Sequence, residues 1–195
     1  MQRLVLASNN AKKLKELGTL LAPLGIELVP QEALNIREAK EPFATFVENA
    51  LAKARHAASL SGLPAIADDS GLCVRALGGA PGVLSARFAG EPKSDERNNQ
   101  LLLEKLLGQT DRTAHFVSLL VLARHADDPQ PIIAEGNWHG EILEAPRGEH
   151  GFGYDPLFWV PEANLSAAEM SPEAKNLCSH RAVAMQQLLA RLHVL

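Results

Sequence analysis

The spacing of apolar residues along the chain predicts an alternation of short strands and amphipathic helices. Apolar runs of four or five residues favour strands, and apolar residues three or four positions apart favour helices. In the first third of the chain these patterns alternate from strand to helix, at residues 3–7, 11–21, 26–29, 46–60 and 64–67. This order predicts right-handed crossovers and therefore an α/β fold, with a mixed, largely parallel central sheet flanked by helices.

The remainder of the chain predicts a second group of elements. Residues 77–93 are rich in Gly and Pro and predict a long loop, and loops of this length are usually functional. A helix follows Ser94, and its leucines are expected to face the core, at positions 101, 102, 103, 106 and 107. Strands at 115–123 and 132–142, joined by a polar turn, are expected to form an antiparallel pair that extends into a second lobe. A last helix at 180–192 completes the pattern. We expect a single domain over 1–195, with two lobes and the active-site cleft between them.

Composition and charge exclude several classes of protein. Of the 195 residues 46% are hydrophobic and 22% charged, as in soluble globular proteins. A formal net charge of -4 gives no general attraction to nucleic acid or to a membrane, so neither is expected as a partner. Cys73 and Cys178 are too far apart for a zinc motif and too few for a disulfide framework. Without a signal-peptide core or a membrane-spanning stretch, a cytoplasmic location is expected.

Two adjacent carboxylates, Asp68 and Asp69, follow the predicted strand at 64–67. Open α/β sheets bind ligands at the carboxyl ends of parallel strands, which is where this strand would place them. The two charges repel each other unless a cation neutralises them, and carboxylate oxygens favour magnesium. The alternative is a polar turn, in which one Asp makes an Asx turn and the other faces water.

Three further segments carry candidate binding residues. "SNNAKK" (8–13) opens a helix, whose N-terminus favours an anion; the alternative is a plain N-cap with solvated lysines. In "GFGYDP" (151–156) the Phe152 ring could stack on a flat ring of a ligand; the alternative is an ordinary turn with Phe152 in the core. "KNLCSHRAV" (175–183) places His180 and Arg181 at the start of a helix, where the helix dipole disfavours cations. This position suggests that they bind a ligand; the alternative is that they are ordinary charged residues at the rim of a packed helix. Together the segments suit a nucleoside triphosphate.

The order of these motifs resembles that of a known family. "LVLASNNAKKLKEL", "TFVENALAKARHA", "PAIADDSGLCVRALGGAPGVLSARFAG", "GFGYDPLF" and "KNLCSHRAVAMQQL" occur as in the inosine triphosphate pyrophosphatase family, which acts on noncanonical purine nucleotides, and look most like its bacterial dITP/XTP branch. The resemblance covers nearly the whole chain. It implies hydrolysis of ITP, dITP and XTP to the monophosphate and pyrophosphate, dependence on Mg²⁺, a homodimer, and a role in cleansing the nucleotide pool.

The resemblance also implies a role for individual residues. Asp69 corresponds to the proton acceptor and magnesium ligand, with Asp68 beside it. Glu41 is the best match for a further metal ligand, although Pro42 and Phe43 replace the usual Thr-Gly and Glu38 or Glu48 could substitute. The substrate-binding positions match Ser8, Asn9, Asn10, Ala11, Lys12, Lys13, Ser70, Phe152, Gly153, Tyr154, Asp155, Lys175, His180 and Arg181.

These residues lead to a hypothesis for the reaction. A water oriented by Asp69 or activated on the metal attacks the α-phosphorus, and His180 or Arg181 donates a hydrogen bond to the C6 carbonyl of hypoxanthine or xanthine. Adenine carries an amino donor at C6, so it would be rejected. Two rival functions are a pyrophosphatase for modified pyrimidine nucleotides, which would lack the "SHR" segment, and a nucleotide sensor that performs no catalysis.

Overall fold

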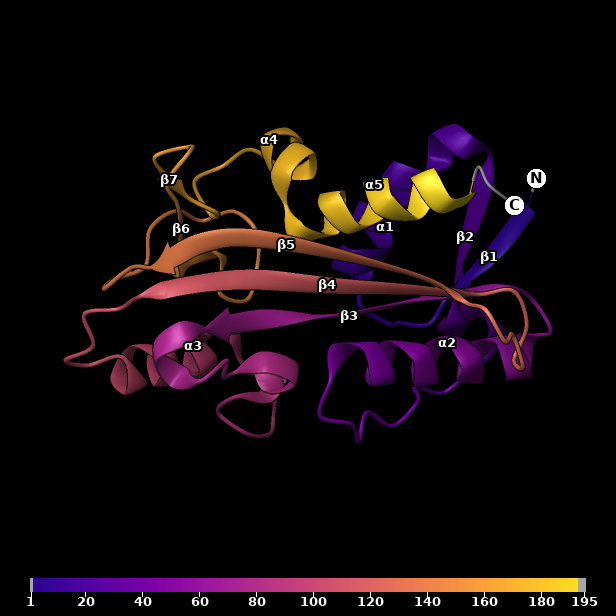
Figure 1. Ribbon diagram of the computed structural model, residues 1–195, viewed down its shortest axis with the longest axis horizontal. Helices are drawn as coiled ribbons and strands as arrows, with labels where there is room; N and C mark the ends of the chain where they lie inside the picture. The colour runs from indigo at the N-terminus through magenta and orange to yellow at the C-terminus, as the bar shows by residue number, and fades with distance from the viewer. Residues whose placement is uncertain (1, 193–195) are drawn as a thin grey trace. The chain divides into compact units, whose positions relative to one another are not determined.

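The computed structural model describes residues 2–192, and the predicted alternation of helices and strands is present (Figure 1). The strands are β1 (Gln2–Leu6), β2 (Ile26–Pro30), β3 (Ala65–Val74), β4 (Thr113–Ala123), β5 (Ile132–Ile142), β6 (Phe158–Val160) and β7 (Leu165–Ser166). The α-helices are α1 (Ala11–Leu21), α2 (Phe46–Ser61), α3 (Asp95–Lys105), α4 (Pro172–Cys178) and α5 (His180–Leu192). Short 3-10 helices are η1 (Ala22–Leu24), η2 (Gln31–Leu34), η3 (Arg75–Leu77), η4 (Gly82–Arg87) and η5 (Asp155–Leu157).

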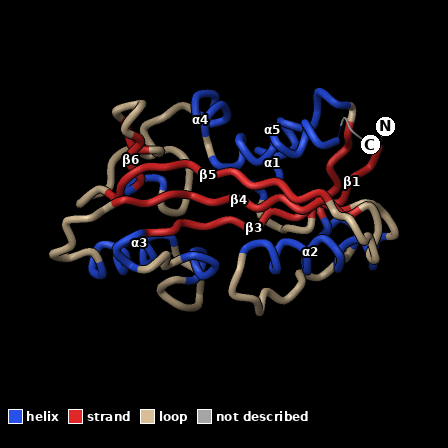
Figure 2. The backbone as a smooth tube through the Cα atoms, viewed as in Figure 1, coloured by secondary structure: helices blue, strands red, loops and turns tan. Residues whose placement is uncertain are grey.

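The described strands pair in the order β2-β1-β3-β4-β5-β6-β7, which confirms an α/β fold with a mixed sheet (Figure 2). β1 is parallel to β2 and to β3, whereas β6 is antiparallel to β5 and to β7. The expectation of a largely parallel sheet was wrong, because the sheet is mostly antiparallel. Parallel neighbours need a crossover of a dozen or more residues, and the connections at 124–131 and 161–164 are too short for one.

The chain divides into two compact units. Of the described residues, unit 1 contains 2–69, 118–136 and 181–192, and unit 2 contains 70–117 and 137–180. Strands β3, β4 and β5 contribute residues to both units.

In unit 1, α2 covers one face of the strands, and α1 and α5 cover the other (Figure 1). Its core is built from aliphatic residues of β1, α1, β3, β4, β5 and α5, namely Leu4, Leu6, Leu17, Leu21, Ile66, Leu120, Leu122, Ile132, Ala134, Ala184, Met185 and Leu188. A capping box marks the start of α2, since Thr45 accepts a hydrogen bond from the Glu48 N–H and donates one to its carboxylate. This cap fixes where α2 begins.

Unit 2 has its own core, formed around Phe116, Trp138 and Phe158. Leu102 of helix α3 and Leu106 at its C-cap are buried as predicted, but Leu107, which follows the cap, is 79% exposed. The Gly- and Pro-rich segment 77–93 forms η4 and turns. The side chain of Asn98 holds this segment by accepting from the Ala89 N–H and donating to the Ser85 and Ala86 carbonyls.

Strand β3 differs from the prediction in a way that matters for the site. It runs from Ala65 to Val74 and so continues through Asp68 and Asp69 instead of ending before them. The two carboxylates therefore lie within a strand, not in a turn at its end.

Among the described helices, none is both long and apolar enough to cross a membrane.

Candidate active site

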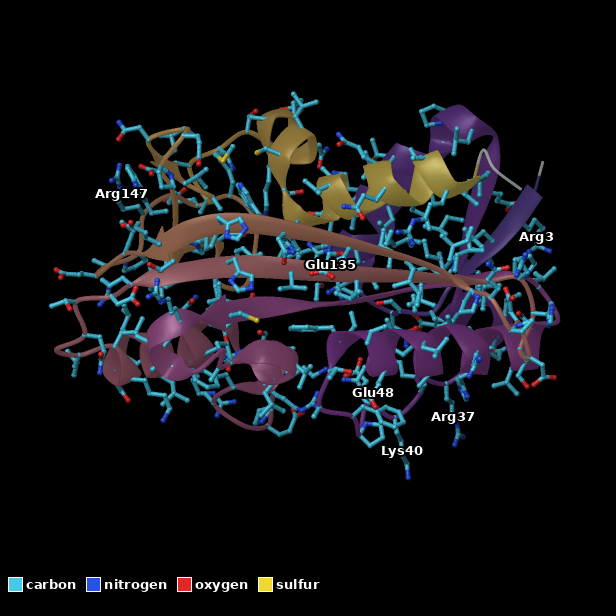
Figure 3. The ribbon with its side chains drawn as sticks, in the orientation of Figure 1. Arg3, Arg37, Lys40, Glu48, Glu135 and Arg147 are labelled. Carbon is cyan, nitrogen blue, oxygen red and sulfur yellow. The ribbon has the colours of Figure 1, made fainter. Side chains whose placement is uncertain are left out.

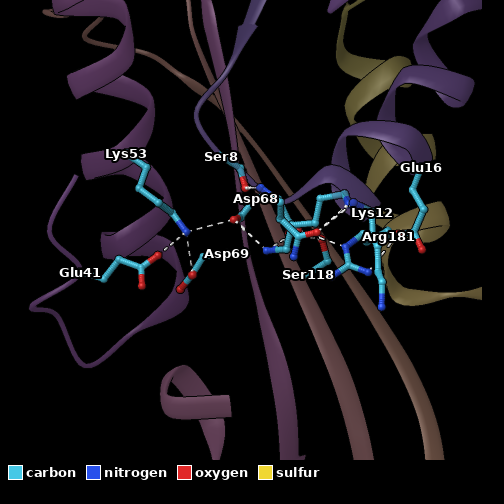
Figure 4. Close-up of polar contacts among 11 residues, drawn as sticks. Ser8, Lys12, Glu16, Glu41, Lys53, Asp68, Asp69, Ser118 and Arg181 are labelled. Carbon is cyan, nitrogen blue, oxygen red and sulfur yellow. Dashed lines mark hydrogen bonds and ion pairs between the residues drawn. The ribbon is translucent and has the colours of Figure 1, made fainter. Parts of the chain in front are cut away.

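The side chains of Asp68 and Asp69 point to opposite faces of β3, because successive residues of a strand alternate between faces. Figure 4 shows Lys53 and Glu41 on the side of Asp69, and Ser118 and Arg181 on the side of Asp68. The structure thus separates two carboxylates that the sequence suggested would share one metal ion. Each has its own partners, described in turn below.

Asp68 is buried in a cluster of cations within unit 1. Its Oδ2 atom lies 2.9 Å from Lys13 Nζ and 3.1 Å from Arg181 Nε, and its Oδ1 atom accepts a hydrogen bond of 2.9 Å from Ser118. Burial alone would raise the pKa of Asp68, but Lys13 and Arg181 outweigh it and lower the pKa well below its ordinary value. Asp68 is therefore an ionised anchor for two cations, and its oxygens are already engaged.

Arg181 bridges two carboxylates of unit 1. Besides Asp68, its guanidinium reaches Glu16 of α1, with 3.0 Å between Nη1 and Oε2. A guanidinium is suited to such a bridge because its donors are arranged in a rigid fork. The arrangement places Arg181 with Lys13, beside the segment predicted to bind phosphates. Burial lowers the pKa of Lys13, although Asp68 opposes the shift.

Asp69 and Glu41 share one ammonium group, that of Lys53 (Figure 4). Lys53 Nζ lies 2.8 Å from Asp69 Oδ1, 2.8 Å from Glu41 Oε1 and 3.0 Å from the Asp68 backbone carbonyl. Burial opposes the charge on Lys53, but the two carboxylates raise its pKa overall. Burial raises the pKa of Asp69, and Lys53 only partly offsets this shift. Lys53 thus remains a cation next to a carboxylate of raised pKa.

The second oxygen of Asp69, Oδ2, is buried and accepts no hydrogen bond from any described residue. A buried carboxylate oxygen without a donor is costly unless a ligand completes it. Among the described residues no three Asp, Glu, His or Cys side chains group as a complete metal site. Mg²⁺ typically binds one or two carboxylates, with substrate phosphates and water as its other ligands. Asp69 and Glu41 fit such an ion, whereas Asp68 has its oxygens engaged.

Of the three glutamates considered from the sequence, only Glu41 lies at this cluster. Glu48 is held by Thr45 at the start of α2, with 2.6 Å between the hydroxyl and the carboxylate, and Glu38 is exposed. Figure 3 shows that Arg37 and Lys40, on the same segment as Glu41, point outward from α2. The segment therefore turns Glu41 inward while its cationic side chains face solvent.

The predicted phosphate segment 8–13 surrounds the start of α1. Asn10 is an N-cap, as the ordinary interpretation expected, and its Oδ1 accepts from the Lys12 and Lys13 N–H groups. Ser8 accepts from the Asn10 N–H, and Gln31 donates to Asn9. Asn9, Asn10, Ala11 and Lys12 are exposed. The capping role and a binding role are compatible, because the exposed side of the segment remains open to a ligand.

In unit 2 the residues of "GFGYDP" are organised around Asp155. Its Oδ2 accepts from the Phe152 N–H at 2.9 Å and pairs with Lys175 at 2.6 Å, and Lys175 Nζ lies 5.5 Å from the centre of the Phe152 ring. Gly151 has φ +78°, and a Cβ there would lie 2.1 Å from the same oxygen, so only glycine fits. This geometry fixes Phe152, Asp155 and Lys175 as one group.

Tyr154 and His180 of unit 2 are both buried. The Tyr154 hydroxyl donates to the Ser85 carbonyl at 2.8 Å, and burial raises its pKa, so this side chain belongs to the core. The His180 ring stacks on Phe116, with centroids 4.8 Å apart and planes 13° from parallel, and also lies beside Trp138. Gly153 is held by α3, through Asp95 and Asn99. Ser70, half-buried in β3, also belongs to unit 2.

The sequence interpretation missed the partners that complete these clusters: Lys53, Ser118 and Glu16. It assigned Lys53 no role, whereas the structure buries this side chain at the cluster. A signal was present, since Lys53 lies three residues after Ala50 and four before Ala57, on the same side of the helix. Ser118 lies in an otherwise apolar part of β4, and a lone serine there gave no such signal.

Comparisons with known proteins place this geometry in a family. The model of the Ham1 family matches residues 4–191. A dITP/XTP pyrophosphatase of Aromatoleum aromaticum is 70% identical over 190 residues, which cover 97% of this chain and 96% of that protein. One of Ralstonia nicotianae is 62% identical over 197 residues, covering 100% and 98%. The solved structure of a HAM1 protein from Coxiella burnetii has a TM-score of 0.95 and 47% identity, covering 100% of both chains.

Proposed function

We propose which side chains of this chain bind the metal ion, the phosphates and the base. The chain belongs to the Ham1 family and hydrolyses noncanonical purine nucleoside triphosphates such as dITP and XTP. The single observation that carries the proposal is the buried Oδ2 atom of Asp69, which accepts no hydrogen bond from any described residue. It lies on a carboxylate of raised pKa beside the Lys53 ammonium. A raised pKa makes Asp69 a better proton acceptor, and its Oδ2 atom is the one that a metal ion would bind.

The metal end of the site consists of Asp69 and Glu41. Enzymes of this class generally depend on a metal ion, and we propose Mg²⁺, because two carboxylates suit a hard cation that takes its other ligands from phosphates and water. When bound, such an ion neutralises charge on the departing pyrophosphate. Lys53 keeps the two carboxylates together between turnovers, since it contacts both.

The phosphate end of the site consists of the 8–13 segment with Lys13 and Arg181. Lys13, Lys12 and the start of α1 provide positive charge for the triphosphate. Arg181 belongs to this end, because it is bound to Asp68 and Glu16 of unit 1. We therefore assign the hydrogen bond to the C6 carbonyl to His180 and not to Arg181.

The residues proposed to bind the base belong to unit 2. Phe152 stacks on the purine, and Asp155 with Lys175 provides an acceptor and a donor for its edge, which a ring with a C6 carbonyl and N–H groups can satisfy. Ser70, Gly153 and Tyr154 remain proposed substrate-binding residues. Water oriented by Asp69 attacks the α-phosphorus and gives its proton to that carboxylate, and the bond from the α-phosphorus to the bridging oxygen of the β-phosphate breaks. The products are the nucleoside monophosphate and pyrophosphate.

The experiment that tests this proposal measures pyrophosphate release from ITP, XTP, dTTP and ATP, with and without Mg²⁺. We expect release from ITP and XTP that requires the metal, and its loss in Asp69→Asn. The matched control is Asp128→Asn, because Asp128 is also a buried aspartate of unit 1 that pairs with a cation, here Arg124 in the 124–131 turn. Preference for dTTP would indicate a pyrimidine enzyme, and binding without release a sensor. Full activity of Asp69→Asn would refute the assignment of Asp69.

Two further properties remain proposals. We propose that the chain acts as a homodimer in the cytoplasm and that 1–195 works as one domain. Light scattering on the purified protein tests the first point, and a monomeric mass with full activity would contradict it.

A further inference from the structure

Helix α2 carries a polar stripe that faces the segment bearing Glu41. Asn49, Lys53 and His56 are spaced i, i+4, i+7 and so lie on one side of the helix. Each contacts the 37–43 segment, at the Phe43 backbone, the Glu41 carboxylate and the Arg37 carbonyl respectively. Residues 36–43 form no helix or strand, so their own backbone pairing does not fix their position. The stripe provides the support instead.

Asn49 makes the most specific of these contacts. Its side chain is 2% exposed, its Oδ1 accepts from the Phe43 N–H, and its Nδ2 donates to the Phe43 carbonyl, each at 3.1 Å. Reversing the amide would set donor against donor and acceptor against acceptor, so the hydrogen bonds fix its orientation. One buried side chain thus satisfies both backbone groups of Phe43.

The location of this clamp follows from the residues around Glu41. Pro42 has no N–H, so Phe43 is the first residue after Glu41 that can donate a backbone hydrogen bond. The Phe43 ring is 42% exposed and does not anchor the segment by burial. The two hydrogen bonds between the Asn49 side chain and the Phe43 backbone are therefore the contacts among described residues that hold the chain immediately after Glu41.

We propose that Asn49 is a positioning residue for the metal end of the site. It acts through Glu41, by holding the backbone two residues away so that the Glu41 carboxylate stays at Lys53 and Asp69. The proposal rests on the function proposed above, in which Glu41 and Asp69 hold the metal ion. Groups that orient metal ligands without touching the ion commonly change metal affinity by about 10- to 100-fold when they are replaced.

The test is a double-mutant cycle on metal binding, read without substrate. Mn²⁺ is the probe, and the free ion is measured by electron paramagnetic resonance in titrations of Asn49→Ala, Glu41→Gln and the double variant. We expect Asn49→Ala to raise the Mn²⁺ dissociation constant about 10-fold. In the Glu41→Gln background the same change should have less than about a twofold effect, because Asn49 acts through that carboxylate.

Asn98→Ala is the matched control. Asn98 is also 2% exposed and also clamps a loop backbone through both ends of its amide, but it does so at 85–89 in unit 2. We expect a similar loss of stability from this variant and an unchanged Mn²⁺ dissociation constant. If Asn49→Ala does not fold, Asn49→Leu, which has the same branched shape and also removes both hydrogen bonds, enters the same cycle.

The outcomes separate this proposal from the function on which it rests. If Glu41→Gln weakens Mn²⁺ binding but Asn49→Ala does not, Asn49 has no positioning role and the proposed metal ligands stand. Equal effects of Asn49→Ala in both backgrounds, or an equal effect of Asn98→Ala, would also overturn it. If Glu41→Gln leaves Mn²⁺ binding unchanged, the assignment of Glu41 fails and the role of Asn49 fails with it.

Discussion

Replacing Lys53 with methionine isolates the contribution of the single ammonium group that Asp69 and Glu41 share. Methionine keeps an unbranched, flexible side chain that can fill much of the same space, and it removes the charge and the hydrogen bonds. Three acceptors lose the hydrogen bond from Lys53 in this variant, namely the two carboxylates and the Asp68 carbonyl, which keeps a longer one of 3.4 Å from Lys13. The variant therefore leaves two carboxylates close together without a cation between them.

The magnitude follows from burial. Removing one partner of a buried ion pair costs about 3–5 kcal/mol. The Glu41 side chain is 31% exposed, so solvent screens its share, whereas that of Asp69 is only 11% exposed. Protonation sets an upper limit: neutralising a carboxyl with an unfolded pKa near 4 costs about 1.4 kcal/mol per pH unit, or about 4 kcal/mol at pH 7. We expect a loss of about 3 kcal/mol in the free energy of unfolding at pH 7.

Lower pH and added Mg²⁺ should each reduce this loss in the free energy of unfolding. Without Lys53 the folded-state pKa of Asp69 rises further, so its unfavourable contribution is largest at pH 7 and decreases as the pH falls through that pKa. A divalent cation that binds the two carboxylates should also replace the missing charge. Mg²⁺ should therefore stabilise Lys53→Met more than it stabilises the unmodified protein.

The assay is urea unfolding followed by circular dichroism, at pH 7 and pH 5, with and without Mg²⁺. Lys15→Met is the control, because Lys15 is an exposed lysine on α1 and its replacement should change stability by less than about 0.5 kcal/mol. A loss below about 1 kcal/mol for Lys53→Met would refute the shared-cation interpretation. Equal stabilisation of both proteins by Mg²⁺ would refute the proposal that the metal and Lys53 serve the same carboxylates.

Three other predictions test the remaining parts of the site. The pKa of Asp68 is lowered in the folded state, so ionised Asp68 stabilises the fold fully above its ordinary pKa of 3.8, and this stabilisation is lost as the pH falls through the folded-state pKa. Asp68→Asn should therefore lower the free energy of unfolding by about 3 kcal/mol at pH 7 and make stability depend less on pH below pH 4. An unchanged acid-unfolding profile would contradict this. Phe152→Ala should raise the KM for ITP about 10-fold with a smaller change in kcat, since stacking of an aromatic ring on a base contributes about 1–3 kcal/mol to binding. Steady-state kinetics measure both constants, and an unaltered KM would show that the purine does not stack on Phe152. Arg181→Lys should reduce kcat/KM for ITP and ATP by the same factor, because the guanidinium that bridges Asp68 and Glu16 is lost. A change in the ratio of the two kcat/KM values would show that Arg181 contacts the base.

Much of the local structure could be predicted from the sequence because its causes are local. The apolar spacing of 11–21 gives α1 its bounds, and Thr45 with Glu48 marks the start of α2. Both long strands were also located, with β5 matching its predicted range of 132–142. These elements depend on side-chain periodicity and on caps, which a single sequence contains.

The errors arose where pairing between distant strands decides the outcome. Two aspartates looked like the end of β3, because their β propensity is low, yet the strand continues through them to Val74. Tertiary partners outweigh propensity here, since Lys13, Ser118 and Lys53 compensate the buried charges. The description of the sheet as largely parallel likewise gave too much weight to the first crossovers, although the strands at 115–123 and 132–142 were expected to be antiparallel.

The continuation of β3 explains why two neighbouring carboxylates differ in chemistry. Strand alternation sends Asp68 toward α1 and α5, which supply Lys13 and Arg181, and sends Asp69 toward α2, which supplies only Lys53. Lys53 is itself shared with Glu41, so that side has two carboxylates for one ammonium, whereas Lys13, Arg181 and Ser118 occupy the oxygens of Asp68. Lacking a second donor, Asp69 keeps a buried oxygen that a metal ion or a water proton can satisfy. A turn at this position would impose no alternation, so it is the extended backbone that assigns one aspartate to anchoring and the other to chemistry.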